Sequence, residues 1–74
     1  MFKLSDKFVK ALVAQPETGM GYQVADVTLK SGLHFRGVTI LNAEYVASVQ
    51  GCQSIPFTEP EIDKITVTHE KLKP

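Results

Sequence analysis

The sequence predicts a small α+β domain in which an N-terminal helix packs on an antiparallel β-meander of four strands. Three observations support this class. Apolar residues near the N-terminus recur at helical spacing, the middle of the chain alternates apolar and polar residues, and short turns separate the alternating stretches. The 74 residues contain no repeat, low-complexity tract or internal boundary, so we expect one domain over residues 1–74.

Residues 5–15 are expected to form the helix. Ser5 can cap the first turn with its side-chain hydroxyl, and Asp6 complements the positive end of the helix dipole. Pro16 disfavours helical geometry at the residue before it, so the helix should end at Gln15. The expected apolar face consists of Leu4, Phe8 and Leu12, with Val9, Ala11 and Val13 widening it.

Strands are expected over residues 22–30, 33–41 and 44–50, after a loop at residues 16–21. This loop is interpreted as a connection from helix to sheet, with a ligand-gating role as the less favoured alternative. Gly32 supplies the positive φ of a hairpin turn, and short turns join antiparallel neighbours, which predicts a meander. The alternation places four residues of the first strand on one face: Gln23, Ala25, Val27 and Leu29.

A short helical turn is predicted over residues 59–63, followed by a fourth strand over residues 64–69. Thr58 and Glu61 have capping-box spacing, and Pro60 is tolerated in a first helical turn. Ile65 and Val67 then alternate with polar residues, as in a strand with one buried face. Since three strands and a turn leave an apolar face uncovered, the amphipathic helix should cover it, giving a curled sheet or a partly open barrel.

Composition and charge argue against several classes of function. Eight basic and eight acidic residues cancel, and the chain has one arginine, so it lacks the positive footprint from which nucleic-acid binding draws its affinity. One cysteine permits no intramolecular disulfide, and no segment has the length of a signal peptide or membrane span. We therefore expect a soluble cytoplasmic protein with no membrane partner, for which nucleic acid is a disfavoured ligand.

The stretch VTLKSGLHFRG resembles the first motif of the Sm- and Hfq-like RNA-binding family, through Val27, Leu29, Gly32, Phe35 and Gly37. The resemblance implies a partly open barrel of the SH3 or Sm type and, by extension, RNA binding. VQG at residues 49–51 echoes the second motif of that family, with glutamine in place of the family's arginine, and the turn lacks the family's acidic or asparagine residue. These departures favour a simple glycine-turned hairpin over an RNA-binding one.

A second resemblance covers most of the chain. LKSGLHFRGVTI followed by SIPFTEPEIDKI is similar to small bacterial proteins of uncharacterised function, which share a glycine-turned hairpin and a proline-phenylalanine-acidic helical turn. This resemblance implies the fold and transfers no activity.

Candidate site residues are few. Lys30, His34 and Arg36 are expected on one side of the first hairpin, where they could bind RNA or an anionic ligand, although such residues are more often a solvated strand face. Cys52, His34 and His69 lack the spacing of a zinc site, and Cys52 lacks a catalytic sequence context. We expect no catalytic residue, metal or cofactor.

The function that the sequence favours is a non-enzymatic interaction module. A sheet of few short strands leaves edges free, and pairing at such edges is a common route to dimers and peptide recognition. The expected partner is another protein or a second copy of the chain, as in a homodimer. Binding of RNA or an anionic ligand through Lys30, His34 and Arg36 is the alternative.

Overall fold

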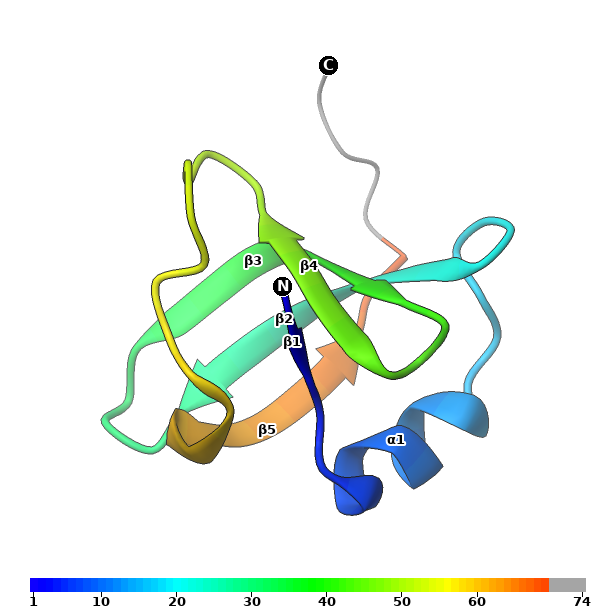
Figure 1. Cartoon of the computed structure of the whole chain (residues 1–74), viewed down its shortest axis with the longest axis horizontal. Helices are drawn as coiled ribbons and strands as arrows, with labels where there is room; N and C mark the ends of the chain where they lie inside the picture. The colour runs from blue at the N-terminus through cyan, green and yellow to red at the C-terminus, as the bar shows by residue number, and fades with distance from the viewer. Residues whose placement is uncertain (70–74) are drawn as a thin grey trace.

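The structure, a computed structural model, describes residues 1–69 of the chain. Figure 1 shows one short helix beside a curled antiparallel sheet. The elements in chain order are β1 (Phe2–Lys3), α1 (Asp6–Val13), β2 (Tyr22–Leu29), β3 (His34–Leu41), β4 (Tyr45–Val49), the 3-10 helix η1 (Glu59–Glu61) and β5 (Ile62–Val67). The predicted class, a small α+β domain with a helix and an antiparallel sheet, is confirmed.

The sheet has five strands in the order β1-β4-β3-β2-β5, all antiparallel to their neighbours. Strands β2, β3 and β4 form the predicted meander, and the sheet curls into a half-barrel. The core lies on its inner face, where residues of α1 and of every strand from β2 to β5 form a single buried cluster. Burial of such apolar surface is the main term that stabilises the fold.

The helix packs on the sheet as predicted, but its details differ. Phe8 and Leu12 are buried in the core, whereas Val13 is 68 % exposed and does not belong to the apolar face. The helix occupies 6–13 rather than 5–15. Ser5 is the N-cap residue but makes no side-chain hydrogen bond, and its carbonyl oxygen accepts the N–H groups of Phe8 and Val9 instead.

The side chain of Gln23 explains why the helix can end before Pro16. Its Nε2 atom donates to the carbonyl oxygens of Leu12, Gln15 and Pro16 at 3.0, 3.3 and 3.3 Å. These carbonyls lie at and just beyond the helix C-terminus, where the helix itself leaves carbonyls without donors, although the Leu12 carbonyl also accepts the Gln15 N–H at 3.0 Å. Gln23 is 1 % exposed, so the end of the helix is capped by a buried polar side chain of β2.

The strand count and several strand bounds correct the prediction. Four strands were expected, and the structure adds β1, whose two residues are too few to give a periodic signal. The fourth predicted strand, 64–69, is β5 and runs over Ile62–Val67, because the helical turn is a single 3-10 turn rather than 59–63. The other strands match 22–30, 33–41 and 44–50 to within one residue at each end.

Three β-bulges account for the faces that alternation misplaced. Arg36 and Gly37 of β3 together oppose Asp26 of β2, Ala47 of β4 has no partner in β3, and Asp63 of β5 has no partner in β2. Each extra residue reverses the alternation, so the buried positions flanking a bulge are separated by three residues. Val46 and Val49 of β4 are consequently both buried, although they are three residues apart.

The turn before β5 follows the expected capping chemistry. Oε1 of Glu61 accepts the N–H of Thr58 at 3.1 Å and its hydroxyl at 2.9 Å. Pro60 lies in the first turn of η1, where its missing N–H removes no hydrogen bond.

Candidate functional site

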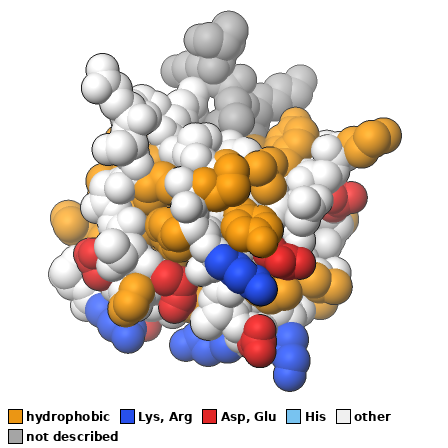
Figure 2. Space-filling model, in the orientation of Figure 1, with side chains coloured by type: hydrophobic (Ala, Val, Ile, Leu, Met, Phe, Trp, Pro, Cys, Tyr) orange, Lys and Arg blue, Asp and Glu red, His pale blue; other side chains and the backbone are white. Residues whose placement is uncertain are grey.

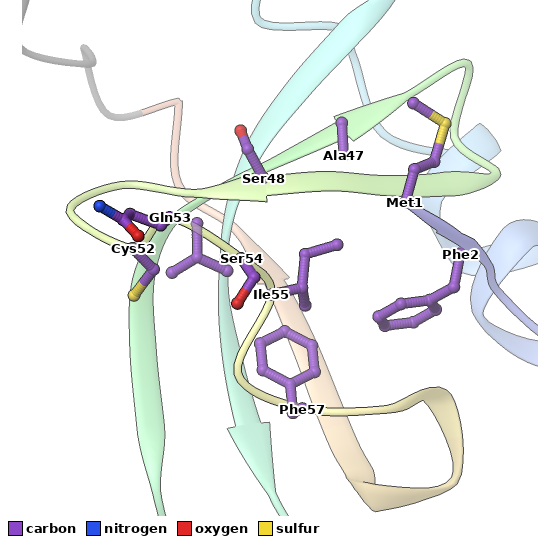
Figure 3. A pocket seen from close by; sticks show the side chains of 10 residues that line it. Met1, Phe2, Ala47, Ser48, Cys52, Gln53, Ser54, Ile55 and Phe57 are labelled. Carbon is purple, nitrogen blue, oxygen red and sulfur yellow. The ribbon is translucent and has the colours of Figure 1, made fainter.

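A groove beside the outer edge of β4 is the candidate site. It has a volume of about 430 Å³ and is lined by residues 1–2, by residues 47–49 of β4, and by residues 52–55 and 57 of the loop after β4. We call it the β4-edge groove. In Figure 3, Ile55 and Phe57 lie in its middle, Met1 and Phe2 lie at one end, and Cys52 lies at the other. The N-terminus and a stretch of the chain more than forty residues away therefore form one surface.

The aromatic rings hold the loop after β4 against the sheet. Phe57 is 4 % exposed and contacts Phe2 edge-on at a centroid distance of 6.0 Å, and Phe35 of β3 at 5.3 Å. Such ring pairs contribute beyond the area they bury. The floor of the groove is therefore a packed aromatic cluster that exists before any ligand binds.

The outer edge of β4 is only partly covered by β1. Phe2 pairs with Val46 and Lys3 with Tyr45, and the adjacent N–H of Leu4 donates to the carbonyl of Glu44. No strand within residues 1–69 pairs with residues 47–49 on this side. An edge of this kind presents unpaired backbone groups to an incoming extended chain.

The orientation of the backbone at Val49 supports this reading. The N–H of Gln50 donates to Gly37 across β3, so the N–H and carbonyl of the preceding residue, Val49, point to the opposite edge. The Val49 carbonyl accepts the N–H of Cys52 at 3.0 Å. The Val49 N–H thus remains as a donor directed at the open edge, and no backbone hydrogen bond to it is found within residues 1–69.

The β4-edge groove has no charged side chain in its lining. Hydrophobic side chains gather over the middle of the face shown in Figure 2, and most charged side chains lie below them. The other edge strand differs, because β5 carries the exposed charges Asp63 and Lys64. Charged residues on an edge strand oppose pairing with other chains, so the outer edge of β5 differs from the uncovered part of β4 at residues 47–49. The short edge strand β1 also carries an exposed charge, Lys3.

The sequence-predicted basic face is present but includes a carboxylate. His34 and Arg36 are both exposed on β3, and Lys30 lies in the turn after β2. Nε2 of His34 lies 3.4 Å from Oδ2 of Asp26, and its Nδ1 lies 3.1 Å from the Thr28 hydroxyl. Asp26 offsets part of the positive charge, so this surface is a weaker candidate for an anion than the three residues alone suggest.

The structure does not bring the cysteine and histidines together into a cluster. His69 Nδ1 lies 2.9 Å from the Thr18 hydroxyl, His34 contacts Asp26 and Thr28, and Cys52 is exposed on the groove. Over the described part of the chain, no three His, Cys, Asp or Glu side chains are arranged to hold a metal ion. Nor is any helix in residues 1–69 long and apolar enough to cross a membrane.

Sequence reasoning missed the groove but gave one signal for it, the PF pair at residues 56–57, which it used only for a resemblance. An isolated phenylalanine in a loop that follows a strand must find a buried place, and here it contacts β1 and β3. Comparison with models of protein families, with curated proteins and with solved structures finds no match. The functional argument therefore rests on the geometry of the groove.

Proposed function

We propose that this protein is a non-enzymatic interaction module that receives an extended, uncharged segment of a partner protein in the β4-edge groove. The observation that carries the proposal is the free edge of residues 47–49, which opens onto a preformed aromatic floor. Backbone pairing at such an edge supplies affinity, and a pocket for an alternate side chain supplies specificity.

The chemistry of the groove defines the segment it would take. Since the side chains that line the groove are uncharged, a buried charge of the partner would lose its water without gaining a side-chain counter-ion. An apolar side chain would instead contact Phe2, Ile55 and Phe57. The expected ligand is thus a short extended peptide with one apolar anchor and uncharged neighbours.

A peptide-binding measurement tests this function. Fluorescence polarisation of labelled extended peptides should show binding of an uncharged peptide with an apolar anchor, and much weaker binding when the anchor is replaced by lysine or glutamate. Ile55→Lys should weaken binding by about tenfold or more. Leu33→Lys, which changes an equally apolar side chain at the β2–β3 turn, is the matched control and should bind as the unchanged protein does.

Chemical modification can block the β4-edge groove without any substitution. Cys52 is the single cysteine and lines the groove, so alkylation with a bulky maleimide should inhibit peptide binding. If neither Ile55→Lys nor alkylation changes the affinity of any bound peptide, the groove is not the binding site. If no uncharged peptide binds better than its charged counterpart, the proposed chemistry is wrong.

A further inference from the structure

A second hollow in the surface lies between the C-terminal end of α1 and the turn that joins β3 to β4. It has a volume of about 520 Å³ and is lined by residues 12–13 and 15–17, by Gln23 of β2, and by residues 42–43 of the turn. We call it the helix-end pocket. Figure 1 shows the end of α1 and this turn on the right of the molecule, whereas the loop after β4 lies on the left. The helix-end pocket shares no lining residue with the β4-edge groove.

The buried part of this lining contains a polar atom without a partner. Gln23 is 1 % exposed, and its Oε1 atom accepts no hydrogen bond within residues 1–69, although its Nε2 atom donates to three carbonyls. An unpaired buried acceptor is costly, so a donor that reaches it stabilises the complex. Because Oε1 is itself buried, a donor reaches it only if the wall of the pocket shifts. That wall includes the exposed side chains of Val13 and Gln15, and exposed side chains change rotamer rapidly.

The charges around the helix-end pocket favour a positively charged ligand. Glu17 lines the pocket, and none of the described lining residues is a lysine, arginine or histidine. The C-terminal end of α1 adds the negative end of the helix dipole, which attracts cations. A cationic N–H donor would therefore meet a carboxylate, the helix dipole and an acceptor that has no other partner.

The rest of the lining is mainly apolar, through Leu12, Val13, Pro16 and Ala43. Val13 is 68 % exposed, so the pocket has an apolar side chain at its rim. Ala43 has a φ of +58°, a left-handed conformation that favours glycine. Its methyl group packs against the core and forms part of the pocket wall. Backbone strain of this kind clusters at ligand-binding sites.

We infer that the helix-end pocket binds a small primary ammonium compound that carries an apolar group. The ammonium group donates to Oε1 of Gln23 and lies near Glu17, and the apolar group contacts Val13 and Ala43. The volume of the pocket lies within the range of small-molecule sites, about 300–1,000 Å³. This inference goes beyond the proposed function, because both the site and the ligand differ from those of the β4-edge groove.

Titration of the unchanged protein with cyclohexylammonium, followed in ¹H–¹⁵N correlation spectra, tests the site. A probe this small should bind with a Kd of about 1 mM. The side-chain amide of Gln23 and the backbone amide of Ala43 should shift along one saturation curve, whereas the side-chain amide of Gln53, in the other groove, should not move. Absence of a saturable shift at Gln23 would overturn the inference.

The charge of the ligand is tested with cyclohexanecarboxylate, which has the same ring and the opposite charge. It should bind about tenfold more weakly than cyclohexylammonium or not at all. Glu17→Gln should weaken binding of cyclohexylammonium by about threefold, because a partly screened ion pair is lost. Asp6→Asn, at the other end of α1, is the matched control and should bind as the unchanged protein does. Equal binding of the two compounds rejects an ammonium ligand.

A substitution at the rim tests the location of the site. Val13→Lys places a cation beside the ligand and should weaken binding of cyclohexylammonium by about tenfold or more, since like charges repel. Leu33→Lys, at another exposed apolar position, should leave it unchanged. Equal effects of these two variants, or no effect of either, would reject the helix-end pocket as the site. Peptide binding to the β4-edge groove should be the same in both variants, so the two functions fail or stand separately.

Discussion

At the scale of single residues, the polar cap made by Gln23 is the least expected feature of the core. Its side chain bonds three carbonyls at and beyond the helix end, and its Oε1 atom has no hydrogen-bond partner within the described residues. Alternation placed Gln23 on one face with Ala25, Val27 and Leu29, and all four are buried. Periodicity reports which way a side chain points, and it does not report which backbone groups the side chain will meet.

Replacing Gln23 with methionine should therefore destabilise the fold. Gln23→Met keeps most of the volume but removes the side-chain donor to the carbonyls of Leu12, Gln15 and Pro16, of which only Leu12 keeps a second donor among the described residues, the Gln15 N–H. We expect the free energy of unfolding to fall by about 1–3 kcal/mol. Circular dichroism recorded during urea denaturation measures this change in the free energy of unfolding. Gln53→Met, at an exposed loop position, should change stability little. Equal stabilities of the two variants would show that the cap contributes nothing.

A second prediction at this scale concerns the stability of a variant at Gly37. Its φ is +66°, and a Cβ atom there would lie 2.7 Å from Oε1 and 2.8 Å from Cβ of Gln50. Gly51 also has a positive φ, +84°, but its Cβ would meet open space. Gly37→Ala should lower the free energy of unfolding by about 1–3 kcal/mol, because both strain and overlap act, and Gly51→Ala by less. Thermal unfolding compares them, and a larger effect at Gly51 would contradict the role of Gln50.

At the scale of elements, the sequence predicts where most strands lie but does not predict the bulges within them. The bounds of the three meander strands were predicted to within a residue because turn residues separate them in the sequence, although bulges interrupt their alternation. The start of β5 was missed because Asp63 interrupts its alternation, so Ile62 and Ile65 face the core three residues apart. A bulge depends on which residue of the partner strand lies opposite, and a single strand's sequence does not contain that information.

The loop after β4 depends on Phe57 more than its sequence indicates. Phe57→Leu keeps an apolar side chain but loses both ring contacts, so we expect the free energy of unfolding to fall by about 1–3 kcal/mol. Amide hydrogen exchange should accelerate selectively at residues 1–3 and 51–58. Phe8→Leu, which removes a buried ring that has no ring partner in the described chain, should leave exchange there unchanged. Uniform acceleration in both variants would show that Phe57 does not hold the loop locally.

At the scale of the whole molecule, the candidate site arises from the order of strands rather than from any motif. The sequence predicted free strand edges but not which edge is open, because β1 is too short to recognise and its pairing with β4 joins residues more than forty positions apart. His34 and Arg36 are both exposed on β3, in agreement with local alternation, and His34 lies beside Asp26. Local patterns thus give faces of strands, whereas the groove needs the complete topology.

The outer edge of β5 carries charged side chains that oppose pairing with other chains, whereas the uncovered part of β4 does not. The outer edge of β5 spans six residues and has no neighbouring strand among residues 1–69, yet it carries Asp63 and Lys64. Replacing both with threonine leaves the net charge at zero and raises the β-propensity of a bare edge. We therefore expect Asp63→Thr/Lys64→Thr to aggregate faster than the unchanged protein, measured by turbidity and thioflavin fluorescence at equal thermal stability.

The control for this prediction removes one acidic and one basic residue away from the edges. Glu17→Thr/Lys30→Thr changes two exposed loop positions, keeps the same net charge and should aggregate at the rate of the unchanged protein. Equal aggregation of the two double variants would mean that overall surface charge, rather than protection of the β5 edge, keeps the chains apart. A selective effect at β5 would instead show that the chain discourages pairing at one edge, and the uncharged edge at residues 47–49 would then stand out as the surface left open for a partner.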